Sequence, residues 1–357
     1  KAVIIGEEGN GKSTLLKWMY DPTLTEDYIE STGERIVGKE QLGYLPQELP
    51  KDEREQSAYD FFCASPAFFD QSPKDLGQLA AQLALPPQVS AKSAALLDGT
   101  TGECLYEKNG DQRALIASTT KIMTGLLVCE AGDLDRTVTV PETAAGTEGS
   151  SMYLKSGETL TRRELLYGMM LHSGNDAALT LAISVSGSEA AFVRQMNRRA
   201  CALNLTQTHF ANPHGLDSGE NYSTALDLAR LAQAALQNEQ FRAVVSTKTI
   251  TCAGRTLTNH NKLLWRYDGC IGVKTGYTRH AGRILVSAAE RGESQLIAVT
   301  LADPDDWRDH VSLLDYGFAV LGSDTPVYPQ NRRIAWKNDC KKFWRAAQVS
   351  PAAGRKS

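Results

Sequence analysis

The sequence has no apolar run near the roughly 18 to 20 residues that a membrane-spanning helix needs. It also lacks the charged-then-apolar N-terminal segment that directs secretion. Its 7 cysteines are scattered without a C-x-x-C pair, so neither a zinc site nor a disulfide framework is expected. The chain begins at Lys1 without Met, which favours a fragment or a processed or joined product.

The composition is ordinary for a globular protein: 357 residues, room for two domains, with 42% hydrophobic and 22% charged residues. A net charge of -4 argues against broad nucleic-acid binding. Residues 323–357 form a locally basic C-terminal tail, which we interpret as solvated. Whether its segment 341–347 touches a membrane stays open.

The first segment of the chain has the pattern of a nucleotide-binding loop. A short apolar strand pattern at residues 1–5 leads into a glycine-rich loop and then a helix-like stretch at 15–20. In such a loop, backbone N–H groups surround phosphates, the lysine reaches the terminal phosphates and the hydroxyl residue holds magnesium. The candidate nucleotide-binding residues are Gly6, Gly9, Gly11, Lys12, Ser13, Thr14 and, further along, Gln47.

This pattern resembles the ATP-binding cassette ATPases, whose glutamine loop is similar to residues 42–47. No signature like L-S-G-G-Q follows, and no apolar strand ending in Asp-Glu follows either. We therefore interpret residues 1–86 as a partial P-loop ATPase fragment of the α/β class without turnover, with ATP and Mg²⁺ as possible ligands. Residues 296–303 superficially resemble the missing strand, but we expect them to be a core strand of the second domain.

A second domain is expected over residues 87–322, after a proline pair that favours an extended linker. Residues 93–98 and 103–106 predict an antiparallel hairpin, and a capping-box pattern at 161–164 begins an apolar-faced helix. Further helices are predicted at 188–203, 223–237 and 306–321, the first two with a serine that can cap, and strands at 247–252, 255–259, 270–275, 284–289 and 295–301. This order of elements indicates an α+β domain with an antiparallel sheet flanked by helices.

Ser118 and Lys121 are the main candidates for a reactive site. A serine hydroxyl is a poor nucleophile at neutral pH, and a lysine with a depressed pKa can act as its base. If a helix opens at Ser118, the i, i+3 spacing places both side chains on one face, with the positive helix end below the nucleophile. Two later tripeptides, Ser173-Gly174-Asn175 and Lys274-Thr275-Gly276, follow in order. Because a single S-x-x-K is common by chance, it is the ordered triple that indicates serine acyl transfer.

Residues 88–322 resemble the low-molecular-weight D-alanyl-D-alanine carboxypeptidases, which are penicillin-binding proteins of the β-lactamase/transpeptidase superfamily. The resemblance rests on A-S-T-T-K-I-M-T at 117–124, H-S-G-N-D-A at 172–177, N-P-H-G-L at 212–216 and K-T-G-Y-T at 274–278. It implies a transpeptidase-like fold and removal of the terminal D-alanine from peptidoglycan stem pentapeptides. It also implies acylation by β-lactams and no cofactor for the peptidase.

The resemblance, together with acyl-transfer chemistry, implies a role for each catalytic residue. Ser118 would attack the carbonyl of the D-Ala-D-Ala bond, and Lys121 would take its proton. Ser173 with Lys274 would relay a proton to the departing D-alanine, and Asn175 would hold an amide of the substrate.

The substrate-binding residues follow the third motif. Backbone N–H groups of Ser118 and Tyr277 would form the oxyanion hole. Thr275, next to Gly276, would bind the terminal carboxylate together with a basic neighbour.

Several interpretations stay open at this point. The basic neighbour of Thr275 is either Arg283 or Arg308. Lys155-Ser156-Gly157 is similar in sequence to the third motif. It leads into a turn and a capped helix, however, so Lys274-Thr275-Gly276 is preferred as the third motif. His172 and His214 lie beside motif residues, yet no G-x-S-x-G elbow surrounds a serine, so we interpret both as structural rather than as part of a Ser-His-Asp triad.

Three other functions are alternatives for this sequence. A class A β-lactamase would carry a Glu-x-x-Leu-Asn landmark, which is missing, and there is no carboxylate from Thr206 to Leu216. A long-lived penicilloyl adduct is therefore expected. A non-catalytic penicillin-binding sensor and an ATP-binding module are the remaining alternatives. ATPase chemistry is cytoplasmic and peptidoglycan trimming is extracytoplasmic, so the sequence suggests an artificial or unusual fusion, with an envelope location expected for the peptidase part.

Overall fold

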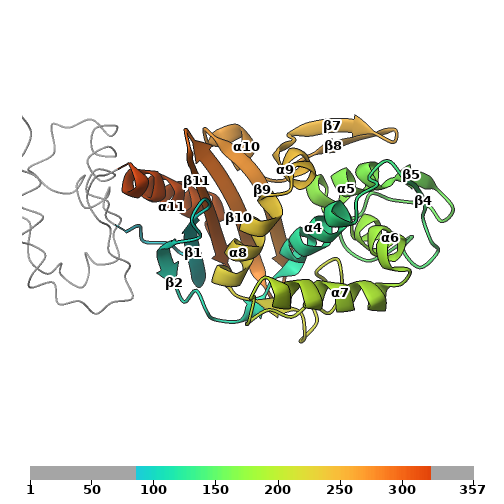
Figure 1. The fold of residues 1–357 in the computed structure, drawn as a ribbon, viewed down its shortest axis with the longest axis horizontal. Coiled ribbons are helices and arrows are strands. Elements are labelled where there is room, and N and C mark those ends of the chain that lie inside the picture. The colour runs from blue at the N-terminus through green and yellow to red at the C-terminus, as the bar shows by residue number, and fades with distance from the viewer. Residues whose placement is uncertain (1–85, 323–357) are drawn as a thin grey trace, which may run out of the picture. The chain divides into compact units, whose positions relative to one another are not determined.

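The structure is a computed structural model that describes residues 86–322 (Figure 1). The nucleotide-binding residues predicted between Gly6 and Gln47 lie outside the described residues, as does the basic tail from residue 323 onwards. The predictions made for those two segments therefore stay predictions.

A five-stranded antiparallel sheet forms one half of the domain, with strand order β2-β1-β11-β10-β9. The hairpin predicted near the start is confirmed as β1 paired with β2. The last three strands also pair with their neighbours in sequence, so that β9 lies at the edge. The strands are β1 (Ser93–Asp98), β2 (Cys104–Lys108), β9 (Cys270–Thr278), β10 (Gly282–Arg291) and β11 (Ser294–Leu301).

The sheet is covered on both faces, which explains why its central strands are apolar on both sides. Helix α11 (Asp306–Leu321) packs on one face and α8 (Ala225–Leu236) on the other (Figure 1). All six residues of β1 are buried, and so are the last six of β11. Most of the segment 296–303 lies in β11, which is the central strand of the sheet. The expectation that this segment is a core strand is confirmed.

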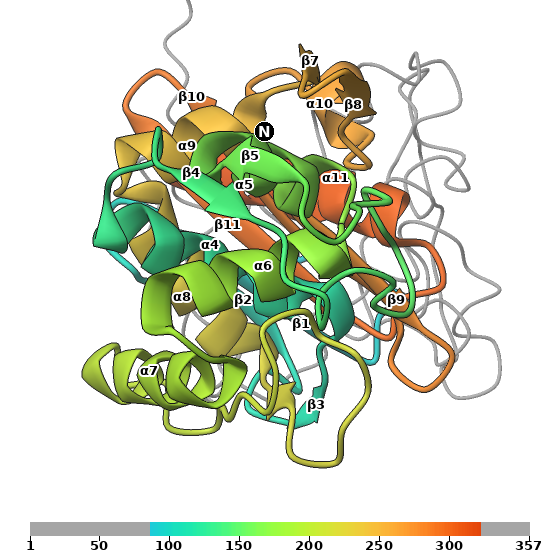
Figure 2. The same ribbon diagram turned by 90° about the vertical axis from the view of Figure 1, so that its right-hand side faces the viewer.

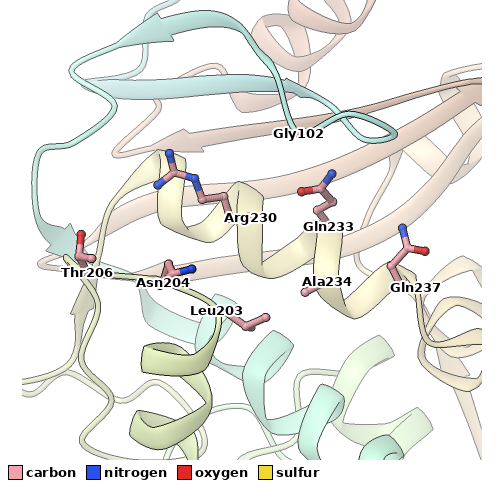
Figure 3. Close-up of a pocket in the computed structure, with 8 residues that line it drawn as sticks. All are labelled: Gly102, Leu203, Asn204, Thr206, Arg230, Gln233, Ala234 and Gln237. Atoms are coloured by element: carbon pink, nitrogen blue, oxygen red, sulfur yellow. The ribbon is translucent and has the colours of Figure 1, made fainter.

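A cluster of helices forms the other half and lies in front of the sheet in Figure 2. The capping box predicted at 161–164 is confirmed, because Thr161 and Glu164 exchange hydrogen bonds at the start of α5. Ser188 caps α7 as predicted, since its side chain accepts from Ala191 N. The cluster contains α4 (Lys121–Ala131), α5 (Arg162–Leu171), α6 (Asn175–Ser186), α7 (Glu189–Ala202) and α9 (Glu239–Ser246).

Two predicted helix starts differ from the structure. Ser223 does not cap α8, because it pairs with Ala114 in a short strand and its hydroxyl contacts Thr208; Thr224 caps the helix instead. Ser118 does not open an α-helix but lies in a 3₁₀ turn, Ala117–Thr120, that leads into α4. Ser118 and Lys121 still lie one turn apart and in contact with each other, as the i, i+3 spacing predicts.

The remaining elements are short and were mostly not predicted. They are β3 (Ala114–Leu115), β4 (Thr137–Thr139), β5 (Thr159–Thr161), β6 (Tyr222–Ser223), β7 (Thr249–Cys252), β8 (Arg255–Thr258) and α10 (Leu263–Arg266). Within residues 86–322 no single helix is long and apolar enough to cross a membrane, although α6 and α7, bent by 84° at their junction, pass that test as a pair.

Candidate active site

The three motifs meet where the edge strand β9 packs against the 3₁₀ turn. Ser118 lies in that turn, Asn175 begins α6, and Lys274 lies on β9. Gly276 permits the approach, because a Cβ at this position would lie 3.3 Å from the backbone atoms Ile116 O, Ser118 N and Thr119 N. The glycine of the third motif therefore has a packing reason that spacing alone does not reveal.

Lys121 is fully buried and lies at the centre of a hydrogen-bond cluster. Its Nζ is 3.0 Å from Ser118 Oγ, 2.6 Å from Asn175 Oδ1 and 2.5 Å from the carbonyl oxygen of His214. Two of these three partners, an amide oxygen and a backbone carbonyl, can only accept hydrogen bonds.

This arrangement suits a neutral lysine. An uncharged amine has two N–H groups for the two obligate acceptors, which leaves its lone pair directed towards the Ser118 hydroxyl. Burial, followed by the nearby charge of Lys274, holds the pKa of Lys121 well below its ordinary value. The geometry thus accommodates the neutral amine, and the lowered pKa favours this form, which can accept a proton from Ser118.

Asn175 is held in the orientation that this cluster needs. Its Nδ2 donates to Glu148 O at 2.6 Å, which leaves Oδ1 as the atom that faces Lys121. Its backbone N–H donates to Ser150 O at 2.7 Å. The loop that joins β4 and β5 therefore supports the site directly, although no sequence motif marks this contact.

Ser173 follows α5 in a left-handed backbone conformation, with φ of 63°, and is nearly buried. Such strain in a non-glycine residue is often found at functional sites. Among the described residues its hydroxyl makes no side-chain hydrogen bond, so the structure does not connect Ser173 to Ser118 or to Lys274 in this way.

Lys274 is buried, and its Nζ donates to Thr275 O at 2.9 Å. Burial lowers the pKa of Lys274 to about 7. Thr275 is half-buried, whereas Tyr277 is exposed.

The competing Lys155-Ser156-Gly157 lies in an exposed loop before β5, away from the sheet, which agrees with the preference for the later tripeptide.

The two histidines beside the motifs do not bind Ser118 through their rings. His214 Nδ1 accepts from Leu216 N at 3.2 Å, and burial with the charge of Lys121 lowers its pKa to about 4. Its backbone carbonyl is the functional contact that sequence reasoning missed. The ring of His172 packs beside that of His260, with centroids 5.3 Å apart.

The two arginine candidates differ in their surroundings. Arg283 Nε donates to Asp306 Oδ2 at 3.2 Å, and a second guanidinium nitrogen contacts the same carboxylate. Arg308 is exposed near the start of α11. Arg283 is thus already paired with a carboxylate.

Within residues 86–322 no group of three or more His, Cys, Asp or Glu side chains could hold a metal ion.

An antiparallel sheet flanked by helices, with a serine–lysine pair beside its edge strand, places the protein among the serine hydrolases with a transpeptidase-like fold. The chain belongs to the D-alanyl-D-alanine carboxypeptidase family, whose family model matches residues 80–305. It is accordingly a serine-type D-Ala-D-Ala carboxypeptidase, and the expected recognition of its second part is confirmed.

Individual relatives agree with this assignment. The chain is 37% identical over 285 residues to the D-alanyl-D-alanine carboxypeptidase DacF of Bacillus subtilis, covering 76% of this chain and 71% of that protein. It is 40% identical over 229 residues to DacD of Escherichia coli, covering 60% and 59%. The crystal structure of the Streptomyces K15 DD-transpeptidase is similar with a TM-score of 0.63 and 36% identity, covering 66% of this chain and 99% of that one.

Proposed function

We propose that Ser118 is the acylated nucleophile and Lys121 its general base. The observation that carries this proposal is the buried cluster around Lys121, whose Nζ lies 3.0 Å from Ser118 Oγ and contacts two obligate acceptors that can take both N–H groups of a neutral amine. A base that is already neutral and within hydrogen-bond reach is what nucleophilic attack by a hydroxyl requires.

The reaction then has two stages. Ser118 Oγ bonds to the carbonyl carbon between the two D-alanines, and its proton passes to Lys121. The C–N bond breaks, the proton held by Lys121 is relayed by Ser173 and Lys274 to the nitrogen of the departing D-alanine, and the remaining peptide stays on Ser118 as an ester. Water attacks that ester, releasing the shortened peptide and restoring the serine hydroxyl.

The substrate is bound by residues of the 3₁₀ turn, of strand β9 and of the start of α6. Backbone N–H groups of Ser118 and Tyr277 stabilise the oxyanion, a contribution of roughly 3 kcal/mol per donor in serine enzymes. Thr275 binds the terminal carboxylate together with a basic neighbour, which is either Arg283, on the adjacent strand β10, or Arg308. Asn175 holds an amide on the acyl side of the substrate.

The substrate is a peptidoglycan stem pentapeptide, met in the cell envelope, and β-lactams acylate the same serine. A β-lactamase-like release of the drug would need a carboxylate that activates water. Asp217, the first acidic residue in the loop after α7, instead binds Thr278 Oγ1 at 2.8 Å and His280 Nδ1 at 3.0 Å. This favours a long-lived penicilloyl adduct.

The direct test is release of D-alanine from a stem pentapeptide. The wild-type chain should release it, whereas Ser118→Ala and Lys121→Ala should not, with folding checked by circular dichroism. Acylation by penicillin without any D-alanine release would instead support a penicillin-binding sensor.

For residues 1–86 the P-loop pattern supports a separate proposal, namely binding of ATP with Mg²⁺ without hydrolysis. Equilibrium binding of labelled ATP that is lost in Lys12→Ala would support it, and equal binding by both proteins would contradict it.

A further inference from the structure

Tyr153 is displayed on the surface in an unusual way. Its side chain is 82% exposed, and its backbone has a φ of 58°, a left-handed conformation that few non-glycine residues adopt. Only eight non-glycine residues of the described part have a positive φ, and two of the others, Ala117 and Ser173, lie within the site already described. Strained backbone conformations are concentrated at functional sites, so an exposed aromatic ring in such a conformation beside a reactive site is a candidate for ligand binding.

The strain is maintained by a buried carboxylate. Asp176 accepts from the backbone N–H of Met152 and of Leu154, each at 3.0 Å, and thereby holds the residue on either side of Tyr153. It also accepts from Ser151 Oγ at 2.6 Å, and Ser151 Oγ in turn accepts from Tyr153 N at 2.8 Å. The backbone around Tyr153 is therefore fixed before any ligand arrives.

The direction of the ring is fixed as well. Met152 and Leu154 are both buried, so the side chain between them must point outwards. Arg255 Nε donates to Met152 O at 3.0 Å, which ties the loop to the β7–β8 hairpin. The same Arg255 forms an ion pair with Glu158 at 2.8 Å, so its charge is already paired. The loop thus presents an uncharged, amphipathic ring in one direction.

The same loop supports Asn175, which places Tyr153 on the acyl side of the reaction centre. Asn175 bonds to Glu148 O and Ser150 O of this loop and to Lys121 on its other side. The terminal carboxylate of the substrate belongs at Thr275, on β9. If Thr275 binds the carboxylate and Asn175 the acyl side, as proposed above, a bound stem peptide would run from β9 past Ser118 towards this loop, with its amino end attached to the sugar of the glycan strand.

We propose that Tyr153 is a binding platform for a saccharide ring of the glycan strand to which the stem peptide is attached. The apolar face of a sugar packs against the phenol ring, while its hydroxyl groups stay in water. Recognition of this kind gives the enzyme a preference for glycan-linked stems over free peptides. The inference rests on the proposed function of Ser118 and extends the substrate beyond the peptide.

The test compares two substrates that share one pentapeptide, one free and one attached to the N-acetylglucosaminyl-N-acetylmuramyl disaccharide. Tyr153→Ala should lower kcat/KM for the disaccharide substrate about three- to tenfold, the range expected for loss of one aromatic stacking contact. It should leave the free pentapeptide and the rate of benzylpenicillin acylation within about twofold of wild type. Tyr153→Phe should retain the preference, since the ring face is kept, and Lys155→Ala, in the same exposed loop, should not change it.

A binding measurement separates this inference from the proposed reaction. In a Ser118→Ala background, the disaccharide-linked pentapeptide should bind more weakly by the same factor when Tyr153 is replaced by Ala, whereas binding of the free pentapeptide should stay within about twofold. An equal loss on both substrates would show that Tyr153 only positions the loop, and unchanged kcat/KM and binding would show that the ring is not used. Either result overturns the platform, whereas a failure of Ser118 to acylate would overturn the reaction and leave the binding test intact.

Discussion

Gly215 lies so close to Ala117 that a Cβ on Gly215 would overlap the carbonyl oxygen of Ala117 and approach Ser118 N to 3.0 Å. Gly215 also has a φ of 89°, which favours glycine on its own account. The loop that supplies the His214 carbonyl to Lys121 is thus fitted directly against the turn that carries the nucleophile.

Replacement of Gly215 by alanine should therefore damage both stability and acylation. The backbone must shift to relieve the overlap, and we expect a loss of roughly 2 kcal/mol or more in the free energy of unfolding. Chemical denaturation measures this loss. Gly219→Ala, in the same loop but with open space around the added methyl group, should stay within about 0.5 kcal/mol of wild type. Equal effects of the two substitutions would contradict the close packing.

Asn175→Asp tests whether a neutral Lys121 matters. A carboxylate 2.6 Å from Nζ would favour the charged lysine and raise its pKa. The acylation rate at neutral pH should fall at least about tenfold and recover as the pH is raised through the new pKa. Stopped-flow measurement of the acylation rate across pH shows both the lower rate at neutral pH and its recovery at higher pH. A profile parallel to that of wild type would mean that Lys121 is not the base.

Lys274 should give the acylation profile a falling limb at higher pH. Burial lowers its pKa to about 7, so its positive charge is present below that pH and is lost as the pH rises through it. Because the protonated Lys274 takes part in the proton relay to the departing D-alanine, kcat/KM should decline above about pH 7. Lys274→Arg keeps a charge that does not titrate, and the decline should disappear in that variant. A decline that persists would have to come from another group.

His310 should make the domain less stable in mild acid. It is buried between Ser287 Oγ at 2.6 Å and Thr300 Oγ1 at 3.0 Å, and burial lowers its pKa to about 3. The neutral form belongs to the folded state, so stability is complete above the ordinary pKa of 6.5 and decreases as the pH falls. Between pH 6.5 and about 5 the loss is about 2 kcal/mol for this one group.

Urea denaturation at several pH values measures that slope. His310→Gln should be less stable at neutral pH but should have a flatter pH dependence, with His214 and His260, whose pKa values burial lowers to about 4, contributing to the slope that remains. An unchanged slope in the glutamine variant would show that His310 does not control it.

Much of the fold could be predicted from local patterns. The β1–β2 hairpin, the capping box at Thr161 and the final helix α11 each depend on residues close together in sequence, and each is confirmed. The family could also be predicted, because three short motifs occur in a fixed order. The cap of α8 was misplaced by one residue because Ser223 is used in a strand pair with a distant segment, which a local rule cannot detect.

The supporting contacts of the site could not be predicted in the same way. The His214 carbonyl, the buried Asp176 and the close approach of Gly215 all depend on which loops meet in space. Their residue types carry no signal of that meeting, since a backbone carbonyl has no sequence identity and a glycine fits many turns.

The central claim, an acyl-serine at Ser118 formed with Lys121 as base, is tested most directly by the intact mass of the protein over time with benzylpenicillin. We predict a stable increase of one drug mass that is absent in Ser118→Ala and strongly slowed in Lys121→Ala. An adduct that persists in Ser118→Ala, or no adduct on a folded wild-type protein, would contradict the account, and a transient adduct with consumption of the drug would indicate a β-lactamase instead.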